Sequence, residues 1–216
     1  MTNRRNIAGK LLKTVVAAVM AVCVLFVCVP QIVTANNKSD DPTENREGFA
    51  AYLYDNTTGL PTPEANAIVE TPDGFIWIGS YGGLIRYDGN TFERFDSRSG
   101  IASVNELFVD DKGDLWVGTN DSGVGVIDRF GNIKMYNKRD GLPSASIRAF
   151  AQGPDGKIYI GTTQGVAYVD TNGSLVWIDD SLINNSYIMQ LELGADGVIY
   201  CLTKENVIFK FAIPDL

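Results

Sequence analysis

The 216-residue sequence contains no histidine. Histidine is the commonest general base and the commonest metal ligand of proteins, so its absence excludes the catalytic and metal sites that depend on it. It also excludes a phosphoacceptor histidine in this chain. The sequence therefore predicts no catalytic motif, no metal site and no cofactor.

Cysteine is scarce. Of the three cysteines, Cys23 and Cys28 lie in an apolar N-terminal stretch, and Cys201 stands alone in the remainder of the chain. A disulfide within the folded part of one copy is therefore excluded, and so is the paired cysteine spacing of a zinc site.

Basic residues are few beyond the N-terminus. The chain has 18 lysines and arginines against 26 acidic residues, a net charge of -8. Four of the basic residues precede Ala35 and no acidic residue does, which leaves 14 basic against 26 acidic residues, or -12, in the remainder. Phosphate recognition needs clustered lysine and arginine. Nucleic acid is therefore excluded as the main partner.

Residues 1–35 have the pattern of an export signal. A basic start precedes the almost wholly apolar stretch from Thr14 to Val29, and Val33-Thr34-Ala35 is a small-residue cleavage site. The apolar stretch is predicted to form a helix, either cleaved as a signal peptide or retained as an anchor that contacts the membrane. Residues 36–48 have the composition of a polar linker. The remainder is expected to be extracytoplasmic, either secreted or membrane-anchored.

A repeat of about 41 residues begins after the linker. Its turn signals are Asp73-Gly74, Lys112-Gly113, Asp155-Gly156 and Asp196-Gly197, which are 39, 43 and 41 residues apart. Each is followed at a fixed offset by Trp77, Trp116, Tyr159 or Tyr200, and two residues later by Gly79, Gly118, Gly161 or, in the last copy, Leu202. Recurrence of several markers together indicates one structural unit copied four times.

Each copy predicts about four short strands, and the period is that of a β-propeller blade. The expected fold is all-β, with blades at about 55–95, 96–136, 137–178 and 179–211 within a propeller domain of residues 49–216. The aromatic column is expected to pack between blades, and the glycine column to allow close backbone approach. Residues 49–54 have the pattern of a stray outer strand. They either complete the fourth blade and close a four-bladed ring, or belong to a further blade of a partial propeller.

The repeats resemble those of the two-component regulator propeller family. The resemblance rests on GLPTPEANAIVETPDGFIWIGSYGGLIRYDG and GLPSASIRAFAQGPDGKIYIGTTQGVAYVD and covers about residues 52–211. It implies the extracytoplasmic ligand-sensing part of a membrane signalling protein, commonly a hybrid histidine kinase or a GGDEF diguanylate cyclase, with many members responding to carbohydrates. The usual propeller of this family has seven blades. The chain is therefore either part of a larger sensor with a C-terminal signalling module, or a stand-alone form.

A small polar ligand, such as a carbohydrate, is expected on the face formed by the loops. The predicted ligand-binding residues are Tyr81, Asn120, Asp121, Thr163 and Gln164 on the loops, and Asn66, Asn105 and Arg148 near the axis. Ser80 belongs to the same face. The alternative is that these polar residues only satisfy turn backbones. Asp88, Asp128 and Asp170 are expected to cap turns, and the tryptophans to belong to the core.

Three functions are compatible with this pattern. The first is a ligand-sensing module. The second is a scaffold for a protein partner, including a homodimer formed through the last blade. The third is a propeller lyase, in which Asp121 or Glu106 would act through a raised pKa.

Overall fold

The computed structural model describes residues 51–95 and 100–212. The predicted N-terminal helix, the whole linker 36–48 and the first two residues of the predicted propeller domain lie outside these residues. From Leu53 onward the chain forms one compact unit. In it, hydrophobic runs bounded by glycine turns form antiparallel strands, and consecutive strands pair with one another.

Four sheets contain all the strands of the described residues. The first consists of β1 (Ala67–Glu70), β2 (Ile76–Ser80), β3 (Gly83–Tyr87) and β4 (Phe92–Arg94). The second consists of β5 (Val104–Val109), β6 (Leu115–Thr119), β7 (Val124–Ile127) and β8 (Ile133–Tyr136). A short 3-10 helix, η2 (Lys138–Asp140), leads to the third, which consists of β9 (Ile147–Gln152), β10 (Ile158–Thr162), β11 (Gly165–Val169) and β12 (Leu175–Trp177). The fourth has three strands, β13 (Ile188–Leu193), β14 (Val198–Thr203) and β15 (Ile208–Ala212).

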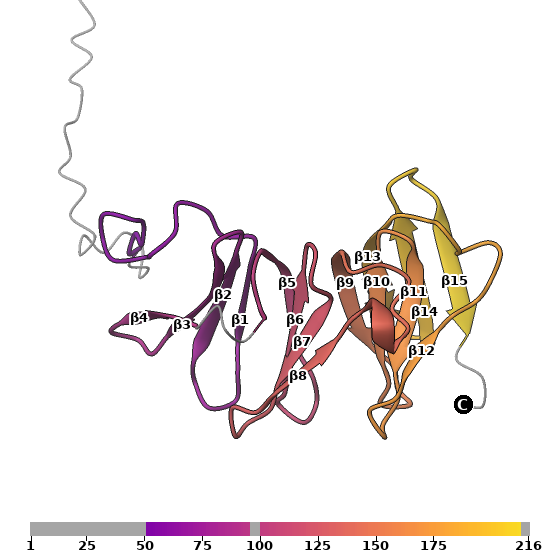
Figure 1. Ribbon diagram of the computed structural model, residues 1–216, viewed down its shortest axis with the longest axis horizontal. Helices are drawn as coiled ribbons and strands as arrows, with labels where there is room; N and C mark the ends of the chain where they lie inside the picture. The colour runs from indigo at the N-terminus through magenta and orange to yellow at the C-terminus, as the bar shows by residue number, and fades with distance from the viewer. Residues whose placement is uncertain (1–50, 96–99, 213–216) are drawn as a thin grey trace, which may run out of the picture. The chain divides into compact units, whose positions relative to one another are not determined.

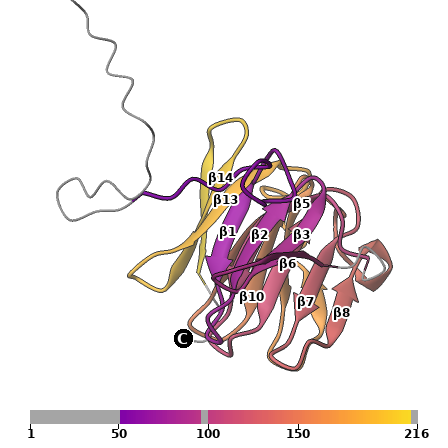
Figure 2. The same ribbon diagram turned by 90° about the vertical axis from the view of Figure 1, so that its left-hand side faces the viewer.

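The sheets stack face to face in chain order (Figure 1). Their first strands are neighbours, since β1 contacts β5, β5 contacts β9 and β9 contacts β13. Figure 2 shows the same stack from its first sheet. This all-β arrangement confirms the predicted propeller blades. Within the unit that begins at Leu53, the first and last sheets lie at opposite ends of the stack. This unit therefore forms a partial propeller and not a closed four-bladed ring.

The glycine column fits one sheet against the next. A Cβ on Gly79 would lie 2.5 Å from Cγ1 of Val104, and a Cβ on Gly118 would lie 2.7 Å from Cγ2 of Ile147. Real Cβ atoms do not approach other carbons so closely. Glycine therefore makes a socket for the branched side chain at the start of the following sheet, which confirms the reason predicted for this column. Gly161 and Ile188 repeat the arrangement at 2.6 Å.

The aromatic column fills the space between sheets, as predicted. Trp77, Trp116 and Tyr159 are 6%, 5% and 3% exposed. The indole Nε1 of Trp77 donates to Oγ1 of Thr71 at 3.0 Å, and that of Trp116 donates to Oδ2 of Asp110 at 2.9 Å. These bonds satisfy the polar atoms that burial removes from water.

The expected outer strand at 49–54 requires a correction. Residues 51–54 form no strand, and residues 49 and 50 lie outside the described part of the chain. Tyr54 contacts the first sheet instead of the fourth: its ring centroid is 5.4 Å from those of both Tyr87 and Phe92, and its hydroxyl is 2.9 Å from that of Tyr87. The fourth sheet has no outer strand in the described residues, because its last strand is β15, as the sequence predicted.

Candidate functional site

The candidate site lies at the end of the sheets where first strands begin and second strands turn into third strands. A buried hydroxyl closes three of these turns. Oγ of Ser80 donates to the Gly83 carbonyl at 3.0 Å, and Thr119 and Thr162 do the same for Gly123 and Gly165 at 2.8 and 2.9 Å. All three hydroxyl residues are fully buried. Ser80 therefore supports its turn and does not face solvent.

Two predicted ligand residues connect neighbouring sheets. The side-chain amide of Asn66 donates to the Val104 carbonyl at 2.8 Å, and that of Asn105 donates to the Ile147 carbonyl at 3.0 Å. Asn66 and Asn105 occupy equivalent positions in the repeat, so each amide bonds the start of the next first strand. These contacts give both residues a structural role. Ligand binding by them stays a prediction.

The loop residues differ in how free they are. Asn120 accepts from Asn105 at 2.7 Å and donates to Oγ of Ser103 at 2.9 Å. Thr163 shares a 2.8 Å hydrogen bond with Ser144. Three of the predicted loop residues are exposed: Tyr81, Gln164 and Asp121, whose carboxylate accepts from Ser122 at 2.8 Å.

Arg148 has a different environment from the two asparagines at its repeat position. Its guanidinium carbon lies 5.4 Å from the ring centroid of Tyr187, and Nζ of Lys204 lies 5.2 Å from the same ring. Nε of Arg148 is buried and has no hydrogen-bond partner among the described residues. We call Arg148, Tyr187 and Lys204 the Tyr187 cluster.

The sequence interpretation missed Tyr187 and Lys204. Both follow from extending the repeat columns into the fourth copy, where Tyr187 corresponds to Ser103 and Lys204 corresponds to Asn120. The backbone confirms the equivalence, because the Lys204 amide donates to the Tyr187 carbonyl at 2.9 Å as the Asn120 amide donates to the Ser103 carbonyl. The degenerate glycine marker of the last copy hid this signal.

Glu106 follows Asn105 on β5 and is partly buried at the junction of the second and third sheets. Burial raises the pKa of this carboxyl, and a hydrogen bond from the Leu107 amide opposes the rise only in part. In the described residues Glu106 has no ion-pair partner. A carboxyl in this environment takes up a proton more readily than one in water.

The aspartate column caps turns, as predicted. Oδ1 of Asp88 accepts from the amides of Asn90 and Thr91 at 2.8 and 2.7 Å, and Asp128 and Asp170 accept from equivalent amides. The backbone hydrogen bond from Thr91 is the main reason why the pKa of Asp88 is lowered. Within 51–95 and 100–212, no group of three acidic or cysteine residues could hold a metal ion.

Comparison with known proteins identifies the repeat. The model of the family described as "Two component regulator propeller" matches residues 59–82, 100–121 and 141–164. No curated protein matches the chain.

Solved structures share the fold. One is described as the extracellular domain of the hybrid two component system BT3049 from B. thetaiotaomicron, with 22% identity, a TM-score of 0.67, and 77% of this chain and 24% of that chain covered. Another, described in the same way for BT4673 of that organism, has 24% identity and a TM-score of 0.58 over 76% of this chain and 23% of that one. Virginiamycin B lyase from Staphylococcus aureus has 19% identity and a TM-score of 0.55, over 69% and 56%.

The chain thus spans about a quarter of the length of both extracellular domains. In the part of the chain that the structure describes, no helix has the length and hydropathy needed to cross a membrane.

Proposed function

We propose that the chain is an extracytoplasmic ligand-binding module of a bacterial signalling protein, because the two-component regulator propeller model matches three of its repeats. Its ligand is a carbohydrate or another polar small molecule, and its output module lies on the same or another polypeptide. The extracellular domains of the hybrid two component systems BT3049 and BT4673 support this role by likeness of fold.

The Tyr187 cluster is the observation that carries the proposal. A buried guanidinium nitrogen without a partner costs about 1–3 kcal/mol, and an oxygen acceptor on a ligand removes that cost. The Tyr187 side chain is partly exposed, and its hydroxyl adds a group that can donate or accept a hydrogen bond. Arg148 and Lys204 on the same ring add positive charge to an otherwise acidic chain. We therefore expect a sugar that bears a carboxylate or sulfate to bind more tightly than its neutral counterpart.

A glycan array and titration calorimetry with the full-length chain test this proposal. We expect saturable binding without turnover, and a loss of about tenfold or more in affinity for Tyr187→Ala and for Arg148→Gln, because each removes a hydrogen-bonding or charged group. Lys204→Ala should weaken binding of acidic sugars more than of neutral ones.

Lys112→Ala is the matched control for Lys204→Ala, because Lys112 is also exposed but lies in the β5–β6 turn at the other end of the sheets. Its affinity should equal that of the wild-type chain. Equal affinity of the Tyr187→Ala chain and the wild-type chain would remove the cluster from the binding site. Product formation from a bound sugar would show that the chain is an enzyme and not a sensor module.

A further inference from the structure

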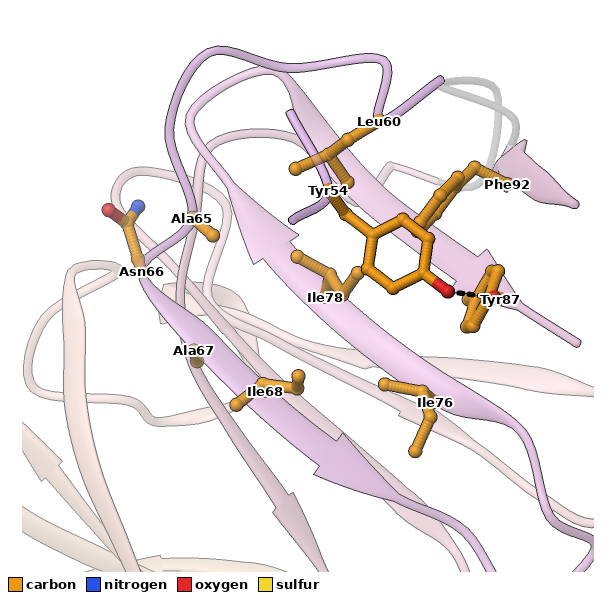
Figure 3. A pocket seen from close by; sticks show the side chains of 10 residues that line it. All are labelled: Tyr54, Leu60, Ala65, Asn66, Ala67, Ile68, Ile76, Ile78, Tyr87 and Phe92. Carbon is orange, nitrogen blue, oxygen red and sulfur yellow. Dashed lines mark hydrogen bonds between the residues drawn. The ribbon is translucent and has the colours of Figure 1, made fainter. Parts of the chain in front are cut away.

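An apolar groove of about 460 Å³ lies on the face of the first sheet that points away from the second. Figure 3 shows Ile68, Ile76 and Ile78 along its floor, with Tyr54, Leu60 and Tyr87 at its upper side. Ile68 is 68% exposed although it lies in the middle of β1. An exposed apolar face of this kind commonly marks an interaction site.

The same positions in the later sheets are buried against the preceding sheet. Leu107, Leu115 and Val117 of the second sheet are at most 4% exposed and pack in one cluster with Trp77 and Leu84 of the first. The third and fourth sheets repeat this with Phe150, Ile158 and Ile160, and with Leu191, Ile199 and Cys201. The groove is therefore one side of a sheet-to-sheet junction. We call the face of each sheet that packs against the following sheet its back face. The occupant that fits the groove is the back face of another blade.

The back face of the fourth sheet complements this groove in size. At the three internal junctions a glycine receives a valine or isoleucine from the next sheet. In the fourth sheet Leu202 replaces that glycine, and in the first sheet Ala65 replaces the branched residue. Compared with an internal junction, the large side chain lies on the fourth sheet and the small one on the first. The total side-chain volume at a junction between these two faces is therefore close to that at an internal junction. Cores tolerate exchanges that conserve volume best.

The same two faces also carry complementary charges. At the first junction, Arg86 of β3 and Asp128 after β7 line one cavity. The residue of the fourth sheet equivalent to Arg86 is the exposed Lys210, since Arg86 pairs with Trp77 and Lys210 pairs with Tyr200. The residue equivalent to Asp128 is Asp88. A junction between these two faces thus brings a lysine to an aspartate.

The strand count fits as well. Tyr54 stands five residues before its glycine marker, as Phe95 does, and Phe95 packs edge-on against Trp77 at 5.5 Å. An equivalent placement puts Tyr54 beside Tyr200, which is the aromatic residue of the fourth sheet. Residues 53 and 54, which form no strand in the structure, would then lie along the outer edge of a sheet that has three strands.

From these observations we infer that the groove binds the fourth sheet of a second copy of this chain. The first and last sheets of one unit lie at opposite ends of the stack, so a single unit does not bring these faces together. Two copies related by a twofold axis form two identical junctions and close a ring of eight blades, a number within the range of known propellers.

The mass of the full-length chain, in the form in which an exporting host delivers it, is the first test. Sedimentation equilibrium at micromolar concentration should give two chains per particle. Ile68→Asp should weaken the dimer by about tenfold or more, because a buried carboxylate without a partner opposes assembly. Phe130→Asp is the matched control: Phe130 is 76% exposed in the β7–β8 turn and belongs to neither terminal face. A monomeric wild-type chain, or a dimer indifferent to Ile68→Asp, overturns the inference.

Cysteine pairing identifies the contact and the partner. Cβ atoms built on Gly79, Gly118 and Gly161 lie 3.2, 3.0 and 3.2 Å from the Cβ of the branched residue opposite. This is close to the Cβ separation of a disulfide, about 3.5–4.5 Å. A chain with both Ala65→Cys and Leu202→Cys should therefore run at the mass of two chains on a non-reducing gel, while either single variant and the wild type should not. A link within one chain, or none, contradicts the inference.

A volume exchange gives an independent readout. Leu202→Gly leaves a gap and Ala65→Ile overfills the junction, so each alone should raise the dimer dissociation constant about tenfold or more. Together they recreate the internal junctions and should return it close to the wild-type value. Blade folding should survive Leu202→Gly, because three of the four copies have glycine there. Additive losses in the double variant contradict the predicted contact.

Discussion

Single glycines on the second strands set the distance between sheets. At Gly118, Cγ2 and Cβ of Ile147 and the ring of Phe150 would lie 2.7, 3.0 and 3.1 Å from an added Cβ. None of these atoms is the free end of a flexible side chain. The socket is therefore a property of one residue, while its effect reaches two sheets.

We expect Gly118→Ala to lower the free energy of unfolding by about 1–3 kcal/mol, the usual cost of an overfilled core. Urea denaturation measures it. Gly82→Ala is the matched control, since an added Cβ there meets nothing closer than 3.5 Å, and it should change the midpoint little. Equal midpoints for the two variants would show that the sheets do not pack on this glycine.

Glu106 predicts a pH dependence of stability. Its folded-state pKa is raised above the ordinary value of 4.5, mainly by burial, so the folded chain bears a cost for the ionised carboxylate. This cost is absent below about pH 4.5, where both states are protonated, and is fully present once the pH exceeds the raised pKa. Glu106→Gln should therefore raise the urea midpoint at pH 7.5 and change it little at pH 4. The opposite pattern would mean that the carboxylate is stabilised by folding.

At the scale of the element, one side-chain amide connects the first strand of the first sheet to that of the second, and another connects the second to the third. Asn66 and Asn105 donate to carbonyls that lie 38 and 42 residues further along the chain. Each spacing is one residue less than the repeat at that place, 39 and then 43 residues, which is why the same residue type at the same position makes the same bond. In the fourth sheet Met189 occupies this position and has no amide to donate.

Removal of one amide should therefore loosen a whole junction. Asn105→Ala leaves the Ile147 carbonyl without this donor and should lower the free energy of unfolding by about 1–2 kcal/mol. Asn172→Ala, at an exposed turn position, provides the comparison and should have a much smaller effect. Hydrogen exchange of the β9 amides gives a second measurement, in which faster exchange in Asn105→Ala alone is expected. Equal exchange in both variants would assign Asn105 to ligand binding only.

The sequence was sufficient for the blades because the repeat carries its own alignment. The predicted four strands of a copy are observed in the first three sheets, and the burial of Trp116 and the turn capping by Asp88 were predicted as well. The amide of Asn105 was assigned to a ligand instead, because its acceptor is a backbone carbonyl of another repeat, and a sequence pattern does not show which groups face each other across a junction. The Tyr187 cluster was missed because the degenerate glycine marker of the last copy hid the repeat columns in which Tyr187 and Lys204 stand.

At the scale of the whole molecule, the two terminal faces differ from the faces at the internal junctions. Interior faces are alike, with a glycine on one side and a branched side chain on the other. The terminal faces carry Ala65 and Leu202 instead, together with the exposed Ile68 and Lys210. Repeat proteins commonly modify their end units in this way, because an end face meets water or a different partner.

The unlike ends also give the assembly a polarity. When a head fits only a tail, successive copies close into a ring of two if the rotation from one copy to the next is half a turn, and into a larger ring if it is a smaller whole fraction of a turn. Any other rotation extends them into a fibre. That rotation is the sum of the angles at the internal junctions and at the junction between copies, and each internal angle depends on how deeply a branched side chain enters a glycine socket. A methyl group added at Gly118, far from either end, would thus act on the choice between a finite particle and an endless one.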